Sequence, residues 1–135
     1  IMASNLKYSN GTRNAQQEGL ITYAGSNAII RIYAGTQPAN ANTAISTQTL
    51  LAALTVTGSF GTDSNGTLTI SSVASTTSVA SGTASFFRIV KSDGTTVVMD
   101  GSIGTSDADM VVNTTTITSG ENVQISSGTI IRNNG

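Results

Sequence analysis

Residues 83–101 read TASFFRIVKSDGTTVVMDG, and they predict a β-hairpin. The runs FFRIV at 86–90 and TTVVM at 95–99 are aromatic and β-branched, which suits a pleated, half-buried strand. Asp93-Gly94 lies between them, and this pair favours a type I′ turn, in which both central residues have positive φ. We therefore expect an antiparallel sheet with a tight two-residue turn at Asp93-Gly94.

Phe86 and Phe87 are neighbours in the first of these strands, so their side chains point to opposite faces of the sheet. Only one of them can enter the core of a two-layer sandwich. The other must be covered, either by an N-terminal helix or by a second subunit.

Turn signals recur roughly every 8 to 12 residues along the chain, the spacing expected of a sandwich or barrel with about seven or eight strands. In the first expected strand, 28–34, Ile30 and Ile32 face the core while Arg31 and Tyr33 lie on a wet face. A long connection, 35–49, follows this strand. Further strands are expected at 50–57, 67–71, 107–113, 114–118 and 122–132.

One short helix is expected at 12–24, where an apolar stripe has spacings near 3.6 residues and Gly25 suits the position after the helix. The stripe consists of Ala15, Leu20, Ile21 and Ala24. The preceding residues, 1–11, are polar and predict an arm that becomes ordered against a partner. The chain is thus interpreted as an all-β protein: an arm, 1–11, and a single antiparallel, jelly-roll-like β-sandwich domain, 12–135, with one short N-terminal helix.

The composition disfavours several classes of function. Ser and Thr make up 40 of the 135 residues, charged residues only 10%, and the net charge is −1. Because no basic cluster exists, we expect no nucleic-acid partner. The absence of cysteine excludes a disulfide framework or thiolate metal site, and no apolar run predicts a membrane span or a secretion signal.

Catalysis and metal binding depend on few candidate residues, since the chain has neither His nor Cys. Asp100, Asp107 and Asp109 are the carboxylates near enough in sequence for a glycosidase pair, but we expect each to cap a turn. Asp107 and Asp109, with the turn 63–66, also resemble part of a calcium loop, but no bidentate Glu follows. We therefore expect no enzymatic activity, metal or cofactor.

Three glycosylation sequons, at Asn10, Asn65 and Asn113, are no more than this composition yields by chance. Asn10-Gly11 and Asn65-Gly66 are interpreted as turns.

Candidate partner-binding residues fall into two groups. Leu6 and Tyr8 are the isolated apolar side chains of the arm. Arg31, Tyr33 and Arg88, with Lys91 close to them in the hairpin, form either a cationic and aromatic patch or an ordinary solvated face.

Three stretches carry a family resemblance: IIRIYAGTQPANANTA at 29–44, TLLAALTVTG at 49–58 and FFRIVKSDGTTVVMDGSIGTSDADM at 86–110. With the Thr-rich tail, they resemble a family of small virion proteins of tailed bacteriophages, from about Arg13 onward. The helix is more polar and more broken by Gly than is expected of that family.

The resemblance implies a structural component with a small β-sandwich or jelly-roll fold and no enzymatic role. The first hypothesis is a capsid decoration or cement protein on the exterior of the head, whose partners are the major capsid protein and copies of itself. A tail or fibre-associated structural protein is the second hypothesis. The third is a glycan-binding adhesin, for which Tyr8, Tyr23 and Tyr33 without any Trp supply few aromatic contacts.

Overall fold

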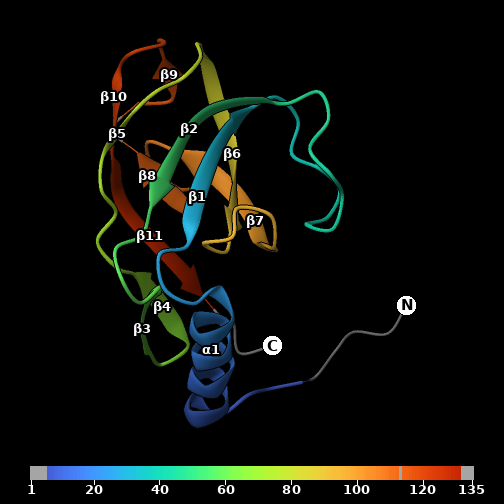
Figure 1. Cartoon of the computed structure of the whole chain (residues 1–135). Coiled ribbons are helices and arrows are strands. Elements are labelled where there is room, and N and C mark those ends of the chain that lie inside the picture. The colour runs from blue at the N-terminus through green and yellow to red at the C-terminus, as the bar shows by residue number, and fades with distance from the viewer. Residues whose placement is uncertain (1–5, 113, 132–135) are drawn as a thin grey trace.

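The structure, a computed structural model, describes residues 6–112 and 114–131 and confirms an all-β protein with one short N-terminal helix (Figure 1). The helix α1 spans Asn10–Ala24. The described residues hold eleven strands rather than seven or eight, because three are two-residue pieces of the loops. The strands are β1 Ile29–Ala34, β2 Thr49–Thr55, β3 Gly61–Ser64, β4 Thr67–Ile70, β5 Thr76–Thr77, β6 Gly82–Val90, β7 Val97–Gly104, β8 Met110–Val112, β9 Thr116–Ile117, β10 Asn122–Val123 and β11 Ile125–Ile131.

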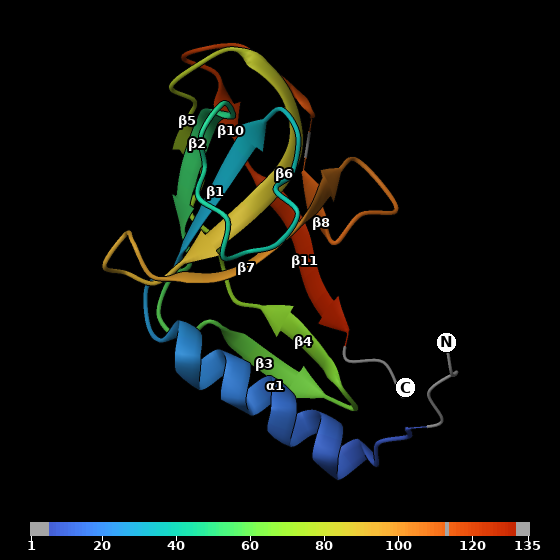
Figure 2. The same cartoon turned by 90° about the vertical axis from the view of Figure 1, so that its right-hand side faces the viewer.

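The main sheet has the strand order β2-β1-β6-β7-β8-β11-β4-β3, and β9 pairs with β6 away from this path. It curls, so that β11 carries the sheet from the β1-β6-β7 end to the β3-β4 hairpin, under which α1 lies (Figures 1 and 2). Its pairs are antiparallel except β7 with β8. The expectation of a purely antiparallel sheet was therefore wrong at this point.

In the parallel β7–β8 pair, Ile103 lies opposite Met110 and Gly104 opposite Val111, and the five-residue loop 105–109 joins the two strands. Asp107 takes a left-handed conformation with φ 50° in this loop. The Asp109 carboxylate accepts bonds from the Ser102 N–H at 2.9 Å and the Ser102 hydroxyl at 3.0 Å. These bonds stabilise a short parallel ladder that Ile103 forms with Met110.

The two expected hairpin turns have different outcomes. Asn65 and Gly66 have φ 49° and 81° and join β3 directly to β4, as a type I′ turn requires. At Asp93-Gly94 only the glycine has positive φ, 78°, so the two-residue turn predicted there was wrong. The ladder ends where the Lys91 N–H donates to the Thr96 carbonyl, leaving the four-residue loop 92–95.

The cause lies in the Asp93 side chain. Its carboxylate accepts bonds from the backbone N–H groups of Thr95 and Thr96, each at 2.8 Å. These bonds satisfy the amides of a wider loop, in which only one residue needs the left-handed conformation.

The helix confirms the sequence prediction at its C-terminal end, where Gly25 has φ 74° and donates its N–H to the Ile21 carbonyl. It begins earlier than expected, because Ser9 is the N-cap and accepts a bond from the Thr12 N–H at 3.1 Å. Asn10-Gly11 therefore forms the first turn of α1 and not a separate turn. Residues 10 and 11 of the expected arm belong to the helix.

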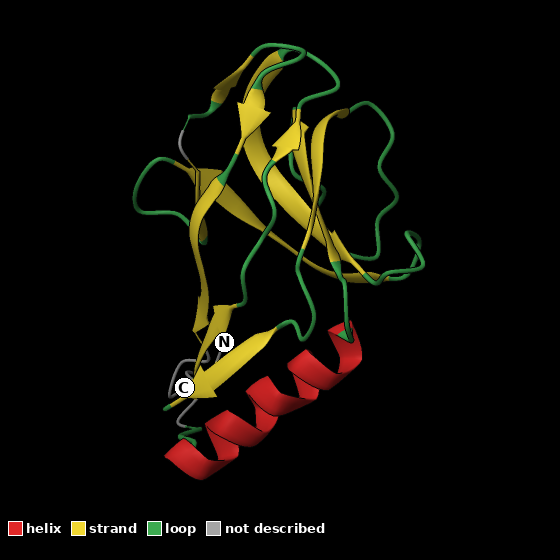
Figure 3. Cartoon of the chain, turned by 60° about the vertical axis from the view of Figure 1, so that its left-hand side comes forward, coloured by secondary structure: helices red, strands yellow, loops and turns green. Residues whose placement is uncertain are grey.

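Helix α1 lies beside the β3-β4 hairpin, as Figure 3 shows from another side, and polar contacts join the two. Gln17 is buried and donates to the Gly66 carbonyl at 2.7 Å, while Asn14 accepts from the Gly66 N–H at 2.8 Å. Leu20, Ile21 and Ala24 pack against the core as expected. Ala15 is exposed instead, because the helix face that meets the hairpin turn is polar.

The core lies inside the curl of the sheet and draws side chains from most of its strands. Its largest members are Ile30, Ile32, Leu51, Leu54, Phe60, Leu68, Phe87, Ile89 and Met110.

Strand β6 is buried on both faces between 86 and 90. Phe87 and Ile89 enter the core, while Phe86 lies on the outer face and stacks on Tyr33, with ring centroids 5.2 Å apart. The expected wet face is therefore wrong for Tyr33, which is 5% exposed, and for Arg88, which is 4% exposed. The connection 35–48 folds back over this face, whereas α1 lies against β3 and β4 (Figure 2).

Gly101 gives a direct test of this packing, because it lies opposite Phe87 and a Cβ there would be 2.4 Å from the ring. We expect Gly101→Ala to lower the free energy of unfolding by about 2 kcal/mol through overpacking. The matched control is Gly19→Ala in α1, where a Cβ meets nothing within 4 Å; it should raise stability by up to about 1 kcal/mol. Urea unfolding measures both, and equal effects of the two substitutions would contradict the packing of Phe87 on Gly101.

Candidate functional site

Three charged residues form a row across the outer face of the sheet. Arg31 on β1 is the register partner of Arg88 on β6, and Arg88 is the register partner of Asp100 on β7. Residues directly opposite one another share a face, so the two cations and the one carboxylate lie side by side. The sequence left open whether Arg31, Tyr33 and Arg88 form a patch or a solvated face, and the structure brings these three together.

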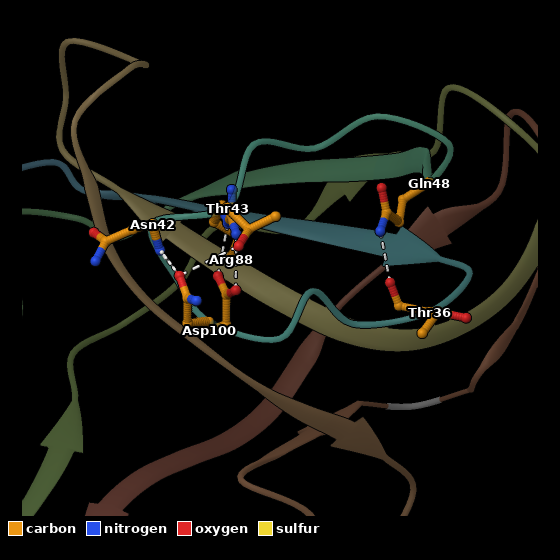
Figure 4. Close-up of polar contacts among 7 residues, drawn as sticks. Thr36, Asn42, Thr43, Gln48, Arg88 and Asp100 are labelled. Atoms are coloured by element: carbon orange, nitrogen blue, oxygen red, sulfur yellow. Dashed lines mark hydrogen bonds and ion pairs between the residues drawn. The ribbon is translucent and has the colours of Figure 1, made fainter.

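Arg88 and Asp100 form a bidentate ion pair, with Nε to Oδ1 at 2.7 Å and Nη2 to Oδ2 at 2.9 Å (Figure 4). Both side chains are 5% exposed. The hydrogen bonds to the carboxylate raise the pKa of Arg88 against the opposing effect of burial, so the guanidinium stays charged. Asp100 therefore neutralises Arg88 within the strand β7, and the turn expected at Asp100 was wrong.

The connection 35–48 is held in shape by its own polar groups (Figure 4). Asn40 Oδ1 accepts bonds from the Asn42 N–H at 3.0 Å and the Thr43 hydroxyl at 3.3 Å. Gln48 Nε2 donates to the Thr36 carbonyl at 2.7 Å, which ties the two ends of the connection together. A preorganised segment thus forms one wall of a pocket over the sheet.

The pocket between this connection, the sheet and the hairpin loop has a volume of about 390 Å³. The sheet contributes the charged row and the aromatic ring, and the connection and the hairpin contribute small and apolar groups. The lining residues are Arg31, Tyr33, Asn42, Ala44, Ile45, Arg88, Val90, Gly94, Thr95 and Val97.

Arg31 is the half-buried cation of this pocket. Its Nη2 lies 3.4 Å from where a Cβ of Gly94 would be, so the guanidinium reaches the hairpin loop. Among the residues that the structure describes, Arg31 makes no hydrogen bond and no ion pair.

Asp93 is the acid of the same hairpin loop. The Thr96 hydroxyl, at 2.5 Å, and the backbone amides of Thr96 and Thr95 lower the pKa of Asp93 well below its usual range. Its carboxylate therefore stays ionised at neutral pH and is engaged with its own loop.

The other predicted partner-binding residues lie elsewhere. Leu6 is 62% exposed and Tyr8 is half-buried, and both precede α1. A helix of 15 residues is about 22 Å long, so this arm starts far from the C-terminal end of α1, where the chain turns into β1. The arm and the charged row are thus two separate groups and not one patch.

The remaining acidic candidates have structural roles. Asp109 bonds to Ser102, and Asp107 occupies the left-handed position of the β7–β8 loop. Over residues 6–112 and 114–131, no three acidic side chains gather in a way that could hold a metal ion. Asn113, the third sequon, lies outside the described residues.

Sequence reasoning missed the contribution of the connection, including Asn42 and Ile45. Its composition is that of an ordinary loop, and strand periodicity carries no information beyond the end of β1. The one available signal was Ile45, a large apolar residue isolated among Thr, Ser and Ala.

Comparisons with known proteins identify no family: no family model matches the chain, and neither the curated proteins nor the solved structures contain a similar one. In the described part of the chain, no helix combines the length and the apolar character that crossing a bilayer requires.

The buried ion pair yields a stability prediction. Asp100→Ala leaves the Arg88 charge buried without its partner, and we expect a loss of about 3–5 kcal/mol in the free energy of unfolding. Replacing both residues by apolar ones, Arg88→Met with Asp100→Leu, should restore most of that loss. Denaturant unfolding of both variants measures the difference.

The control is Asp63→Ala on β3, since Asp63 forms no ion pair with any described residue. Its effect should stay within about 0.5 kcal/mol. An Asp100→Ala variant as stable as Asp63→Ala would show that the pair does not hold the outer face.

Proposed function

We propose that this chain is a non-enzymatic structural protein of a tailed-bacteriophage virion, a decoration or cement protein on the capsid exterior. Its partners are the major capsid protein and further copies of itself, as a homo-oligomer. The stretches at 29–44, 49–58 and 86–110 support the family, as does the structural use of Arg88, Asp100 and Asp109, which leaves these groups bonded within the fold.

The observation that carries the proposal is the chemistry of the sheet edges. The strands at the two ends of the main sheet, β2 and β3, carry one charged residue, the half-buried Asp63, and their exposed side chains are small and uncharged. These side chains are Thr49, Ala53, Thr55, Thr62 and Ser64. On β2, the Ala74 and Val79 N–H groups already donate to the Thr55 and Leu51 carbonyls, whereas β3 pairs only with β4 among the described residues. Proteins that stay monomeric protect an open edge with charges, because unpaired strand edges associate. Hydroxyl-bearing edges also dock with less desolvation cost than charged ones.

A jelly-roll-like sandwich is part of the proposal. The curl supports it, because side chains from β1, β2 and β6 meet side chains from β4 and β8 in one core. Such a domain covers a surface with its sheet edges and loops.

Cement proteins act by linkage. A protein that binds the assembled shell but not its separated subunits stabilises the shell by the free energy of occupancy. Many copies on one particle, each contacting more than one shell subunit, multiply this effect.

A tail or fibre-associated structural protein is the second candidate, since the same edges would serve there. Copy number per particle separates it from a head protein. The adhesin hypothesis is weakened by two aromatic rings that are already engaged: Tyr33 is buried under the connection, and Lys91 Nζ lies 4.1 Å above the ring of Tyr23.

A charge on the free edge tests the proposal. Thr62→Lys adds a charge to the exposed side of β3, and Thr105→Lys adds the same charge to the exposed β7–β8 loop. On heads of the phage that encodes the chain, stripped of this protein, we expect Thr62→Lys to weaken binding at least about tenfold, or about 1.4 kcal/mol. Thr105→Lys should bind as the unchanged protein does, and co-sedimentation measures both.

The same heads test the arm. A chain that begins at Ser9 keeps the N-cap of α1 and loses Leu6 and Tyr8, so it should melt normally and bind less tightly. Full-length protein that sediments with tails and not with heads would move the proposal to the tail. Binding to neither would refute a virion role.

A further inference from the structure

We propose that the pocket over the sheet binds a carboxylate, held by the Arg31 guanidinium between Tyr33 and the hairpin loop at Gly94. The ligand is a monoanion with a short apolar stem, the chemistry of a small carboxylic acid or of an acidic side chain. This inference rests on the pocket alone and does not depend on the virion role.

The charge row provides the first argument. Two arginines lie directly opposite each other on β1 and β6, an arrangement that destabilises a sheet when no anion is near. Asp100 neutralises one of them, using both of its oxygens on Arg88. The row therefore keeps one excess positive charge, and that charge belongs to Arg31.

The neighbouring charged groups leave this charge uncompensated. Asp93, the acid of the hairpin loop, is bonded to Thr95 and Thr96. Lys91 is a further cation and lies over Tyr23. From β1, β6, β7 and the connection 35–48, the described residues facing the pocket offer Arg31 no carboxylate.

The shape and lining of the pocket select the anion. A guanidinium presents parallel N–H groups that match the two oxygens of a carboxylate. Apolar contacts for a hydrocarbon stem come from Tyr33, Ile45, Val90 and Val97. The same apolar groups would make the burial of a phosphate dianion costly, because the dianion would lose its hydration. A volume of about 390 Å³ lies in the range of small-molecule sites.

Asn42 supplies a further polar group on the wall of the pocket. Its backbone N–H is bonded to Asn40, while its side-chain amide has no hydrogen bond to any described residue (Figure 4). The side-chain NH2 group of Asn42 can donate a further hydrogen bond to a carboxylate oxygen that already accepts one from Arg31.

Titration with sodium butyrate, at constant ionic strength set by sodium chloride, tests the site on the isolated protein. Nitrogen-15 NMR should show saturable shifts at the Arg31 Nε–H and at the amides of Gly94 and Thr95. Arg31→Gln should weaken butyrate binding at least about tenfold without unfolding the protein, because it also removes the repulsion with Arg88.

Lys7→Gln is the matched control, since it removes the same charge from the arm, and it should leave butyrate binding unchanged. Arg31→Lys keeps the charge but loses the paired N–H donors of the guanidinium, so its affinity for butyrate should fall between those of the unchanged protein and Arg31→Gln. Butyrate shifts that do not saturate, or that Arg31→Gln leaves intact, would overturn the proposal. Inorganic phosphate binding more tightly than butyrate would overturn the choice of anion.

A second experiment, on stripped heads, distinguishes the two possible sources of the carboxylate. If Arg31→Gln weakens head binding, the carboxylate is an acidic side chain of the shell. If head binding is unchanged while butyrate binding is lost, the ligand is a free carboxylic acid. Because the butyrate titration needs no heads, failure of the virion role and failure of the pocket are distinguishable.

Discussion

Strand β6 is buried on both of its faces, and a charged residue, Arg88, lies in the middle of that burial. Burying a guanidinium without a partner costs too much free energy, so Asp100 stands opposite Arg88 on β7. The apolar neighbours Phe86 and Val90 on the same face are also buried. Tyr33 stacks on Phe86, and the connection 35–48 lies over Tyr33, Arg88 and Val90. The core of the curled sheet and the outer face of β1-β6-β7 are thus coupled through one strand.

The candidate site follows from the same constraint. The connection 35–48 joins β1 to β2 and leaves a pocket between itself, the hairpin loop and the row of charges. Arg31 lines this pocket and forms no ion pair with any described carboxylate. The residues that stabilise the outer face and those that line the pocket are therefore largely the same. A substitution at Arg88 or Asp100 would alter both, whereas Arg31 can be changed with little effect on the pair that holds the strands.

Local features of the sequence were sufficient for the helix end at Gly25, the strand 29–34 and the turn at Asn65-Gly66, because each depends on contacts within a few residues. They failed where distant segments compete. Tyr33 alternates like an exposed strand residue, and only the fold-back of 35–48 buries it. At Asp93 the side-chain carboxylate accepts bonds from the Thr95 and Thr96 amides and stabilises a wider loop than the expected two-residue turn. The pairing of Arg31, Arg88 and Asp100 requires the register of three strands, which no single stretch encodes.

The central claim is that the connection 35–48 is an ordered cover and not a mobile loop. Nitrogen-15 relaxation at Asn42, Thr43 and Ile45, compared with Phe87 and Ile89 in β6, measures this most directly. For an ordered cover we expect backbone order parameters near those of β6, about 0.85. Values below about 0.6 for the connection would contradict it, since a mobile segment could neither cover Tyr33 and Arg88 nor form the wall of a pocket.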